Sequence, residues 1–303
     1  PKFGQPSYFD VFGEYAIELS PTARLSVNGL YADDKVRLVL ETDPEEREEV
    51  VSATRNAQFW LRLENQWSDS LSSNTVLAFV DFSNRRRGET RDPEKMVATV
   101  NDDRNTQQVS LLQDWVWAPS DSHRTQWGLQ VTYSDAEFSY EAQAEYGGLQ
   151  AIILDPVSDV TRSLRAQPTG ASYAAYISDR WKLSARAMVE WGLRWDDQTY
   201  TELDSDAQLS PRISLMYRTS ERTELRFSAG RYQQSQPIQS LQIEDGITRY
   251  SPAQRADHVI AGLQYLTPGD IAVRVEAFYK DIHRVRPRYE NLYDPLGIIP
   301  ELQ

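Results

Sequence analysis

The connections between the predicted strands alternate strictly between short and long along the whole chain. The short polar turns are residues 19–23, 68–73, 119–123, 182–186, 218–222 and 266–270, and the long links are residues 33–56, 83–102, 138–171, 196–207 and 233–251. In an antiparallel meander, this order places every short turn at one end of the sheet and every long link at the other. Soluble β-sandwiches rarely sort their connections in this way, because both of their ends face the same solvent.

The segments between these connections repeat their apolar residues with a period of two, which is typical of β-strands. In one of them, Leu225, Phe227 and Ala229 share one face, whereas Glu224 and Arg226 lie on the other. The same alternation occurs in residues 25–31, 59–64, 189–195, 213–217, 259–265 and 273–279. We predict about twelve strands, most of about ten residues or a little more, which is near the length that a tilted transmembrane strand needs. No amphipathic helix longer than a turn or two is predicted.

Short turns at one end and long links at the other are typical of transmembrane β-barrels. A mean hydropathy of −0.59 and the lack of a run of about 20 apolar residues exclude a bundle of membrane-spanning helices. Trp117 and Trp181 lie beside short turns, and Tyr31 and Trp195 lie near long links, as expected for aromatic rings at the level of lipid headgroups. The sequence therefore predicts an all-β, antiparallel, up-and-down transmembrane β-barrel, with apolar faces toward lipid and polar faces toward a lumen. A soluble β-sandwich is the alternative fold.

Charge and cysteine content exclude several classes of protein. The chain has 32 Lys and Arg against 45 Asp and Glu, a formal charge of −13, which argues against nucleic acid as a partner. It contains no cysteine, so it has no disulfide framework, zinc-finger spacing or thiol nucleophile. Its first residues, PKFGQPSYFD, lack the basic start and apolar core of a signal peptide.

Several stretches together resemble the β-barrel of TonB-dependent outer-membrane receptors of the proteobacterial type. They are RLSVNGLYADD (24–34), SDRW (178–181), EWGLRWDDQTY (190–200), LSPRISLMYRTSERTELRFSAGRYQQSQ (209–236), AQRADHVIAGLQY (253–265) and RVEAFYKDIHRVRPRYENL (274–292). The resemblance implies a 22-strand barrel that is closed by an N-terminal plug domain and lies in the outer membrane of a Gram-negative bacterium. It also implies uptake of a scarce ligand, such as a metal chelate, a vitamin or a glycan, with energy relayed by TonB.

The sequence departs from that pattern at both ends. We find no plug and no TonB box before the first strand, and about twelve strands are fewer than 22. Residues 1–303 are therefore expected to be part of a receptor barrel whose plug domain and closing strands are not in this chain, and the TonB complex would bind through that missing N-terminal region. Outer-membrane lipid, lipopolysaccharide and the transported ligand are the other expected partners. The alternative is a complete twelve-strand barrel, sealed by pairing of its last strand with residues 8–19.

No catalytic, cofactor-binding or metal-binding motif is present, so we predict no enzyme and no cofactor. The chain lacks GxSxG, HExxH, GxGxxG and P-loop strings, and its three histidines do not have the spacing of metal ligands. An outer-membrane enzyme would need an acid–base group at one rim, where His258 and His283 could lie near Asp257 and Asp281. The sequence also fits a passive porin-like barrel or a structural anchor barrel in place of a receptor.

Three acidic stretches could bind divalent cations through clustered oxygen ligands. They are residues 41–50, 100–105 and 243–246. None has the EF-hand spacing, and a run of charges is usually a solvated loop. We therefore expect all three to be solvated loops.

A basic cluster near the end of the chain is the one candidate contact site. Arg284, Arg286 and Arg288 recur at every second position, so an extended segment would present them on one side. Because guanidinium groups bind carboxylate and phosphate, the cluster could contact an anionic ligand, lipopolysaccharide phosphates or the surface of a plug. The alternative is pairing with carboxylates of the barrel wall such as Glu290.

Overall fold

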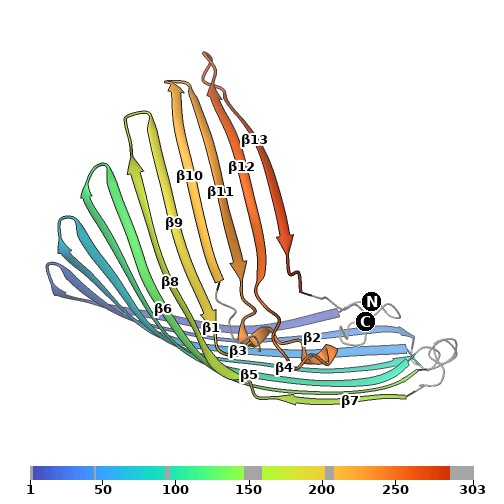
Figure 1. The fold of residues 1–303 in the computed structure, drawn as a ribbon. Coiled ribbons are helices and arrows are strands. Elements are labelled where there is room, and N and C mark those ends of the chain that lie inside the picture. Colours follow the sequence, from blue (N-terminus) through green and yellow to red (C-terminus); the bar gives the residue numbers. More distant parts are fainter. Residues whose placement is uncertain (1–2, 44–45, 93–95, 147–158, 202–207, 287–303) are drawn as a thin grey trace.

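The computed structural model describes residues 3–43, 46–92, 96–146, 159–201 and 208–286, which form one antiparallel sheet (Figure 1). Its strands are β1 (Phe3–Ser20), β2 (Ala23–Asp43), β3 (Glu46–Ser68), β4 (Leu71–Asp92), β5 (Met96–Ser120), β6 (His123–Tyr146), β7 (Asp159–Ala166), β8 (Thr169–Lys182), β9 (Ala187–Gln198), β10 (Gln208–Ser220), β11 (Thr223–Gln234), β12 (Gln254–Leu266) and β13 (Ala272–His283). Each strand pairs with its neighbours in the chain, except that β7 pairs only with β6, and β8 then continues the sheet beside β6.

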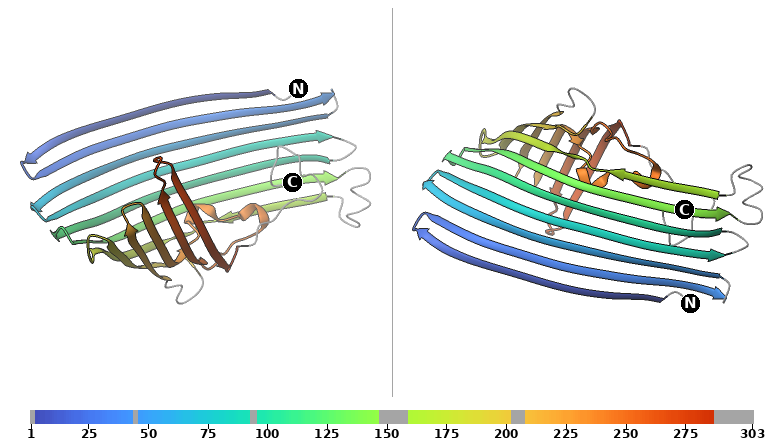
Figure 2. Two further views of the ribbon diagram at one scale, coloured as in Figure 1. Left: turned by 90° about the horizontal axis from the view of Figure 1, so that it is seen from above. Right: turned by 90° about the horizontal axis from the view of Figure 1, so that it is seen from below.

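The sheet is strongly curved. In Figures 1 and 2, β8 to β13 turn away from the layer formed by β1 to β6, so that one face of the sheet is concave. Within the described residues, the order of the sheet runs from β1 to β13 without a crossover, as in an up-and-down meander. This confirms the predicted fold class.

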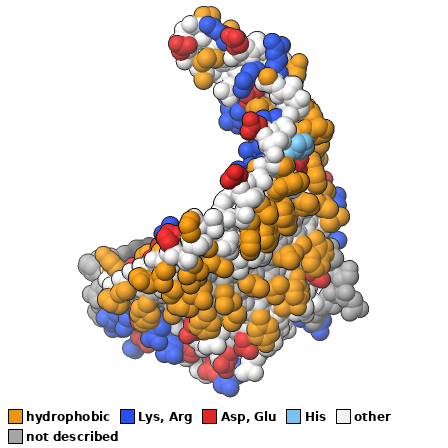
Figure 3. Space-filling model, turned by 90° about the vertical axis from the view of Figure 1, so that its left-hand side faces the viewer, with side chains coloured by type: hydrophobic (Ala, Val, Ile, Leu, Met, Phe, Trp, Pro, Cys, Tyr) orange, Lys and Arg blue, Asp and Glu red, His pale blue; other side chains and the backbone are white. Residues whose placement is uncertain are grey.

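The period-two pattern fixes the register of the sheet, because a shift by one residue would move every apolar side chain to the other face. In the hairpin of β10 and β11, Ile213 pairs with Ala229, Leu215 with Phe227, and Tyr217 with Leu225. These residues lie on the convex face, where Ile213 remains 48% exposed. Figure 3 shows such side chains as a broad apolar band, with charged side chains gathered at its lower edge.

Carboxylates end the apolar rows of the convex face on the side away from the short turns. In five strands an aromatic residue is followed, two positions later on the same face, by an aspartate. The pairs are Tyr31 and Asp33, Phe79 and Asp81, Tyr133 and Asp135, Trp195 and Asp197, and Tyr279 and Asp281. The apolar band therefore has a sharp edge, where aromatic rings are replaced by charge.

The predicted strands are too short for β1 to β6, whereas β8 to β13, with 12–14 residues, have about the predicted length, and several predicted long links are largely strand. Residues 33–56 lie almost entirely in β2 and β3, and residues 83–102 lie mostly in β4 and β5. These parts of the strands carry charged residues on both faces, a pattern that is typical of loops. In the structure, however, their charges pair across neighbouring strands. Arg37 donates a hydrogen bond to Glu49 at 2.6 Å, and Arg87 donates one to Asp103 at 2.6 Å.

The short turns are confirmed, and little helix is present in the described part of the chain. Tight turns join β1 to β2, β3 to β4, β5 to β6 and β10 to β11, all at the same end of the sheet (Figure 1). The described helices are two single turns of 3₁₀ helix, η1 (Ile238–Ser240) and η2 (Ile243–Asp245). No described helix has the length and apolar content needed to cross a membrane.

Candidate ligand-facing site on the concave face

The segment between β11 and β12, residues 235–253, folds back onto the concave face and is called the docked segment below. Ile238, Leu241 and Ile243 of this segment are almost completely buried. They pack with inward-facing residues of β5 and β6 in the main apolar cluster of the described structure. The strand residues in this cluster are Met96, Ala98, Val100, Ala136, Phe138, Tyr140, Ala142 and Ala144.

The sequence of β6 explains where the docked segment binds. Nearer the short turn, the inward positions are polar, with Gln130, Thr132 and Ser134. From Ala136 to Ala144 the inward positions become apolar instead. This apolar patch would be exposed on the concave face, and the docked segment covers it. Gly246 ends η2 with a φ of 79°, a conformation that glycine adopts without strain, and its N–H donates a hydrogen bond to the Ile243 carbonyl at 2.9 Å.

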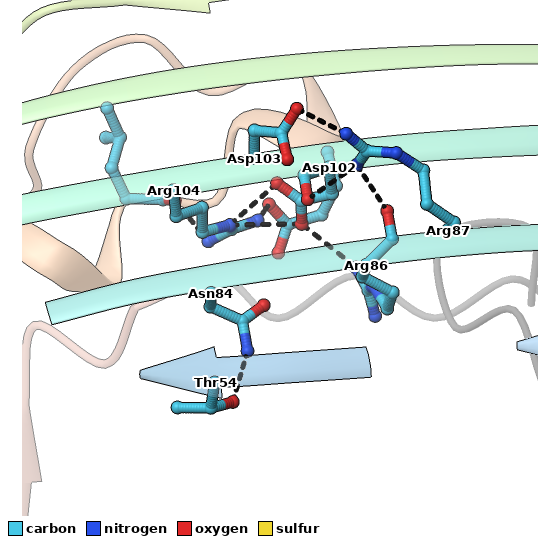
Figure 4. A network of polar contacts seen from close by, with 9 residues as sticks. Thr54, Asn84, Arg86, Arg87, Asp102, Asp103 and Arg104 are labelled. Atoms are coloured by element: carbon cyan, nitrogen blue, oxygen red, sulfur yellow. Dashed lines mark hydrogen bonds and ion pairs between the residues drawn. The ribbon is translucent and has the colours of Figure 1, made fainter. Parts of the chain in front are cut away.

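Arg104 of β5 joins the docked segment to the wall, that is, to the concave face of the sheet (Figure 4). Its Nε donates hydrogen bonds to both carboxylate oxygens of Asp102 at 3.0 Å. Its terminal nitrogens donate to the Leu241 carbonyl at 3.2 Å and to the Glu244 carboxylate at 2.5 Å. Burial alone would lower the pKa of Arg104, but the hydrogen bonds and charges of Asp102 and Glu244 outweigh this effect and raise the pKa. Arg104 is therefore a fixed cation between wall and segment.

Asp102 is the centre of this network. It is only 2% exposed and also accepts a hydrogen bond from Arg86 of β4 at 3.1 Å. Arg87, next to Arg86, points to the other face of the sheet and pairs with Asp103 at 2.6 Å (Figure 4). The buried half of the network holds the docked segment, whereas the exposed half ties β4 to β5.

Two tyrosines hold the other end of the docked segment. Tyr200, just after β9, donates a hydrogen bond to the Gln236 carbonyl at 3.2 Å, and Tyr250 donates one to the Ile238 carbonyl at 2.7 Å. Their rings meet edge to face with centroids 4.9 Å apart. Burial raises the pKa of both phenols above the ordinary value, so both remain hydrogen-bond donors at neutral pH.

A cavity of about 220 Å³, called the side pocket below, lies between η1 and the inward faces of β6, β8 and β9. Its walls include Gln130, Ser172, Gln198, Tyr200 and Gln239. Gln198 is 5% exposed, and neither its amide oxygen nor its amide nitrogen has a hydrogen-bond partner among the described residues. A buried amide without partners is costly, so it marks a place where an external group can bind.

A second cavity, of about 400 Å³, lies at the opposite end of the concave face, near the short turns. Its lining includes Glu18, Arg24, Glu64 and Asp114. Arg24 lies 3.7 Å from Glu18 and 3.9 Å from Glu14, so part of its charge is paired. This cavity is larger than the side pocket, but it is charged and open, and no described segment covers it as η1 covers the side pocket.

The basic cluster is only partly within the described residues. β13 ends at His283, and Arg284 has a φ of 57°, so the strand conformation stops at the first of the three arginines. With its oxygen turned toward Arg286, the amide of Gln254 accepts hydrogen bonds from the Arg286 backbone N–H at 3.0 Å and from its Nε at 3.2 Å. Arg288 and Glu290 lie outside the described residues, and contact of the cluster with a ligand, lipopolysaccharide or a plug stays a prediction.

The prediction that the acidic stretches are solvated loops is wrong where the structure describes them. Residues 100–105 belong to β5, and Asp102 is buried because two arginines neutralise it. Glu49 belongs to β3, and hydrogen bonds from Arg37 and Arg47 lower its pKa. Glu244 is half-buried and pairs with Arg104. Among the described residues, no group of three or more acidic or histidine side chains is arranged to hold a metal ion.

The histidines lie at two ends of the sheet. His123, the first residue of β6 beside a short turn, contacts Asp179 at 3.0 Å and stacks on Trp181. His258 and His283 lie at the opposite rim, as expected, and His283 is 3.0 Å from Asp281. His258 packs against the ring of Tyr232.

The charged residues of the concave face pair with one another. Arg62 contacts Glu64 at 2.8 Å, Arg226 contacts Glu224 at 2.6 Å, and Arg274 contacts Glu276. These partners are two positions apart in the same strand. A cross-strand pair joins Arg180 to Glu190 at 2.9 Å.

A family model for the β-barrel of TonB-dependent receptor-like proteins matches residues 5–286. The structure is also similar to solved structures of uptake and transport proteins at low sequence identity. The ferric yersiniabactin uptake receptor FyuA from Yersinia pestis is 9% identical, with a TM-score of 0.58, over 91% of this chain. The RagAB peptide importer in its open-open state is 10% identical, with a TM-score of 0.57, over 92% of the chain. The copper transporter OprC is 13% identical, with a TM-score of 0.53, over 93% of the chain.

These similarities cover only part of the solved proteins. The chain spans 43% of FyuA, 42% of the RagAB chain and 53% of OprC. No curated protein matches the sequence. At these identities the solved structures establish the fold alone.

Proposed function

Because this chain belongs to the family of TonB-dependent receptor-like β-barrels, we propose that it forms part of an outer-membrane receptor that takes up a scarce ligand. The ligand classes that fit the family resemblance are metal chelates, vitamins and glycans. The concave face, with the docked segment and the side pocket at the end away from the short turns, would be the surface that the ligand meets first.

The docked segment is the observation that carries this proposal beyond the fold. It covers an apolar patch of the wall, is fixed by Arg104 and two tyrosines, and leaves a polar cavity beneath it. A passive pore needs no such cavity. A receptor, in contrast, needs fixed polar groups that hold one ligand.

The remaining parts of the proposal concern the surroundings of the sheet. The apolar convex face would meet outer-membrane lipid, and the charged extensions would meet lipopolysaccharide in the outer leaflet of a Gram-negative cell. Since the chain spans about half of similar receptors, we propose that residues 1–303 belong to a larger barrel of 22 strands. Its plug domain and closing strands would lie outside these residues, and TonB would act through the N-terminal part.

We also propose that Arg284 and Arg286, together with Arg288, contact an anionic group of the ligand, of lipopolysaccharide or of the plug. Arg284 and Arg286 follow β13 at the rim opposite the short turns, where such a group could reach them. Replacing all three with glutamine should weaken that contact without unfolding the sheet, because Arg284 and Arg286 lie outside β13. Unchanged uptake and unchanged lipopolysaccharide binding by this variant would refute the contact.

Growth on a limiting nutrient tests the receptor proposal. Cells that lack the whole protein should fail to grow when one ferric chelate, cobalamin, copper or an oligosaccharide is supplied at limiting concentration. Loss of the energy-coupling protein TonB should cause the same defect, because uptake depends on energy. If loss of the protein instead lowers the entry of many small solutes equally, with or without TonB, the barrel is a passive pore and the proposal fails.

A further inference from the structure

We infer that the side pocket binds a saccharide ring, that is, a neutral polyhydroxylated unit of the transported ligand. The inference rests on the proposed receptor function and names the chemistry of one part of its ligand. It depends on three properties of the pocket: its neutral hydrogen-bonding walls, its unpartnered amide and its size.

The walls of the side pocket present amides and hydroxyls. Gln130, Ser172, Gln198 and Gln239 come from three strands and from the docked segment, and each can donate and accept hydrogen bonds. Hydroxyl groups of a sugar also donate and accept, so either orientation of each amide can be satisfied. A ligand that carries only acceptors, such as a phosphate or a carboxylate, would leave half of these groups unpaired.

Two of the three charged residues at the pocket, Arg194 and Asp196, neutralise each other, and the third, Asp197, belongs to the convex face and accepts a hydrogen bond from the Gln198 backbone N–H at 2.8 Å. Arg194 donates three hydrogen bonds to Asp196, with distances of 2.7, 2.9 and 3.0 Å. This geometry is the close two-pronged pairing that arginine forms with carboxylates. An anionic ligand would have to compete with Asp196 for the guanidinium, and a metal ion would have to compete with Arg194 for the carboxylate. A neutral ligand displaces neither partner.

Gln198 supplies an independent observation that points to a ligand in the pocket. Both polar atoms of its side chain are buried without a partner among the described residues, although the residue lines the cavity. The carboxamide places an acceptor and a donor side by side. Two neighbouring hydroxyls of a sugar ring match this pair, one donating to the oxygen and the other accepting from the nitrogen.

The volume of the cavity fits a single sugar ring better than a whole ligand. The cavity of about 220 Å³ is below the roughly 300–1,000 Å³ of sites that enclose a drug-sized molecule. Tyr200 and Ile238 add ring and methyl surface for the apolar face of a sugar. A peptide is less favoured, because most polar groups of the walls are neutral amides and hydroxyls, and Arg194 and Asp196 already pair with each other.

A cysteine reporter tests the inference on the purified whole protein, since this chain contributes no cysteine of its own. Ser172→Cys places a thiol in the side pocket, and the rate of its modification by neutral iodoacetamide is measured. D-glucose, D-galactose, D-mannose, D-xylose and N-acetyl-D-glucosamine are each added at about 100 mM. A sugar with a dissociation constant near 10 mM should slow the modification about tenfold.

Ser178→Cys is the matched control, because Ser178 lies on the same face of β8, six positions closer to the short turn. Its modification should be unaffected by every sugar. The inference is overturned if none of the five sugars protects the thiol of the Ser172→Cys variant, or if trialanine or citrate protects it in their place. The assay needs no energy source, so a negative result leaves the receptor proposal to be judged by TonB-dependent growth.

A second variant separates binding from folding. Gln198→Met keeps the length of the side chain but removes the amide, so sugar protection of the thiol of the Ser172→Cys variant should disappear. Thermal unfolding should occur at the same or a higher temperature, because a buried polar group without partners has been removed. Protection that persists in this variant would show that the amide does not contact the ligand and would overturn its assignment.

Discussion

Burial decides how much each arginine of the Asp102 network contributes to stability. Arg104 is 17% exposed in its side chain and pairs with Asp102 and Glu244, whereas Arg87 is 46% exposed and pairs with Asp103. An exposed ion pair is worth about 0–1 kcal/mol, because water screens it. Removing one partner of a buried pair costs about 3–5 kcal/mol, because the other charge stays buried. The two residues lie in adjacent strands and differ chiefly in burial.

Replacing Arg104 with methionine should therefore release the docked segment. Glu244 and the Leu241 carbonyl would lose their partner, and Asp102 would keep only Arg86. We expect a loss of about 3–5 kcal/mol in the free energy that holds the segment on the wall. Hydrogen exchange should become faster in residues 235–253 but not in β10 and β11. Arg87→Met is the control and should change exchange in the segment very little; equal acceleration in both variants would contradict the role of burial.

Asp257, a carboxylate at the rim of the sheet, allows a second prediction about a single residue. It lies on the convex face beyond the apolar band, and hydrogen bonds from Arg255 and then Arg231 lower its pKa to about 2. Because the folded-state pKa is below the unfolded value of about 3.9, its contribution to stability is complete above that value. The contribution is lost as the pH falls through about 2. The difference in unfolding free energy between wild type and Asp257→Asn should be constant above about pH 5 and shrink below about pH 4. A difference that varies between pH 5 and 8 would contradict this assignment.

At the scale of strands and segments, the sequence predicts the order of the elements, the short turns and the faces of the strands. These depend on period-two patterning and on turn residues, which are local. Strand ends were wrong, because Arg86 and Asp102 neutralise each other only when β4 and β5 are paired in register. Before the register is known, both stretches look like solvated loops.

The docked segment and the side pocket were not predicted. Ile238, Leu241 and Ile243 are apolar but have no strand period, and their partners in β5 and β6 lie about 100 or more positions earlier in the chain. One local signal was available: the inward positions of β6 change from polar to apolar at Ala136. When the inward positions of one strand change from polar to apolar along its length, the change indicates that another segment covers the apolar part.

The two faces of a single strand give the sharpest test of the membrane assignment. Ile213 is an outward residue in the middle of the apolar band, and Ser214 is the next residue, on the concave face. Ile213→Arg should cost about 2–4 kcal/mol in a lipid bilayer if the site is near the midplane. Ser214→Arg should cost much less, because its side chain meets the wet interior. The unfolding free energy of both variants, refolded in lipid vesicles, checks this; equal costs would rule out a lipid-facing convex surface.

For the whole molecule, the height of the apolar band can be compared with the thickness of the membrane. Trp181 and Tyr173 are outward residues near the two edges of the band in β8. They are eight positions apart, which is about 27 Å along a strand. At a tilt of about 40° the height is about 20 Å, somewhat below the apolar belt of about 25 Å in outer-membrane barrels.

Spin labels can measure this placement. A label at Val131, inside the band, should be accessible to oxygen, which concentrates in lipid. A label at Asp135, four positions and about 13 Å further along the same face of β6, should be accessible to a water-soluble nickel chelate. A label at Thr132, on the concave face, is the control for a wet lumen and should also meet the chelate. Equal access of the chelate to positions 131 and 135 would place the band outside the membrane.

The docked segment has a consequence for the order of assembly. Nearly all strand pairs join neighbours in the chain, so hairpins can form early and add to one another at low entropic cost. The contacts of Arg104 with Leu241 and Glu244, in contrast, join residues 137 and 140 positions apart. They can form only after β6 to β11 have paired and the sheet has curved. Burial of Ile243 would then be one of the last folding steps, and its protection from solvent would report that the wall has reached its final curvature.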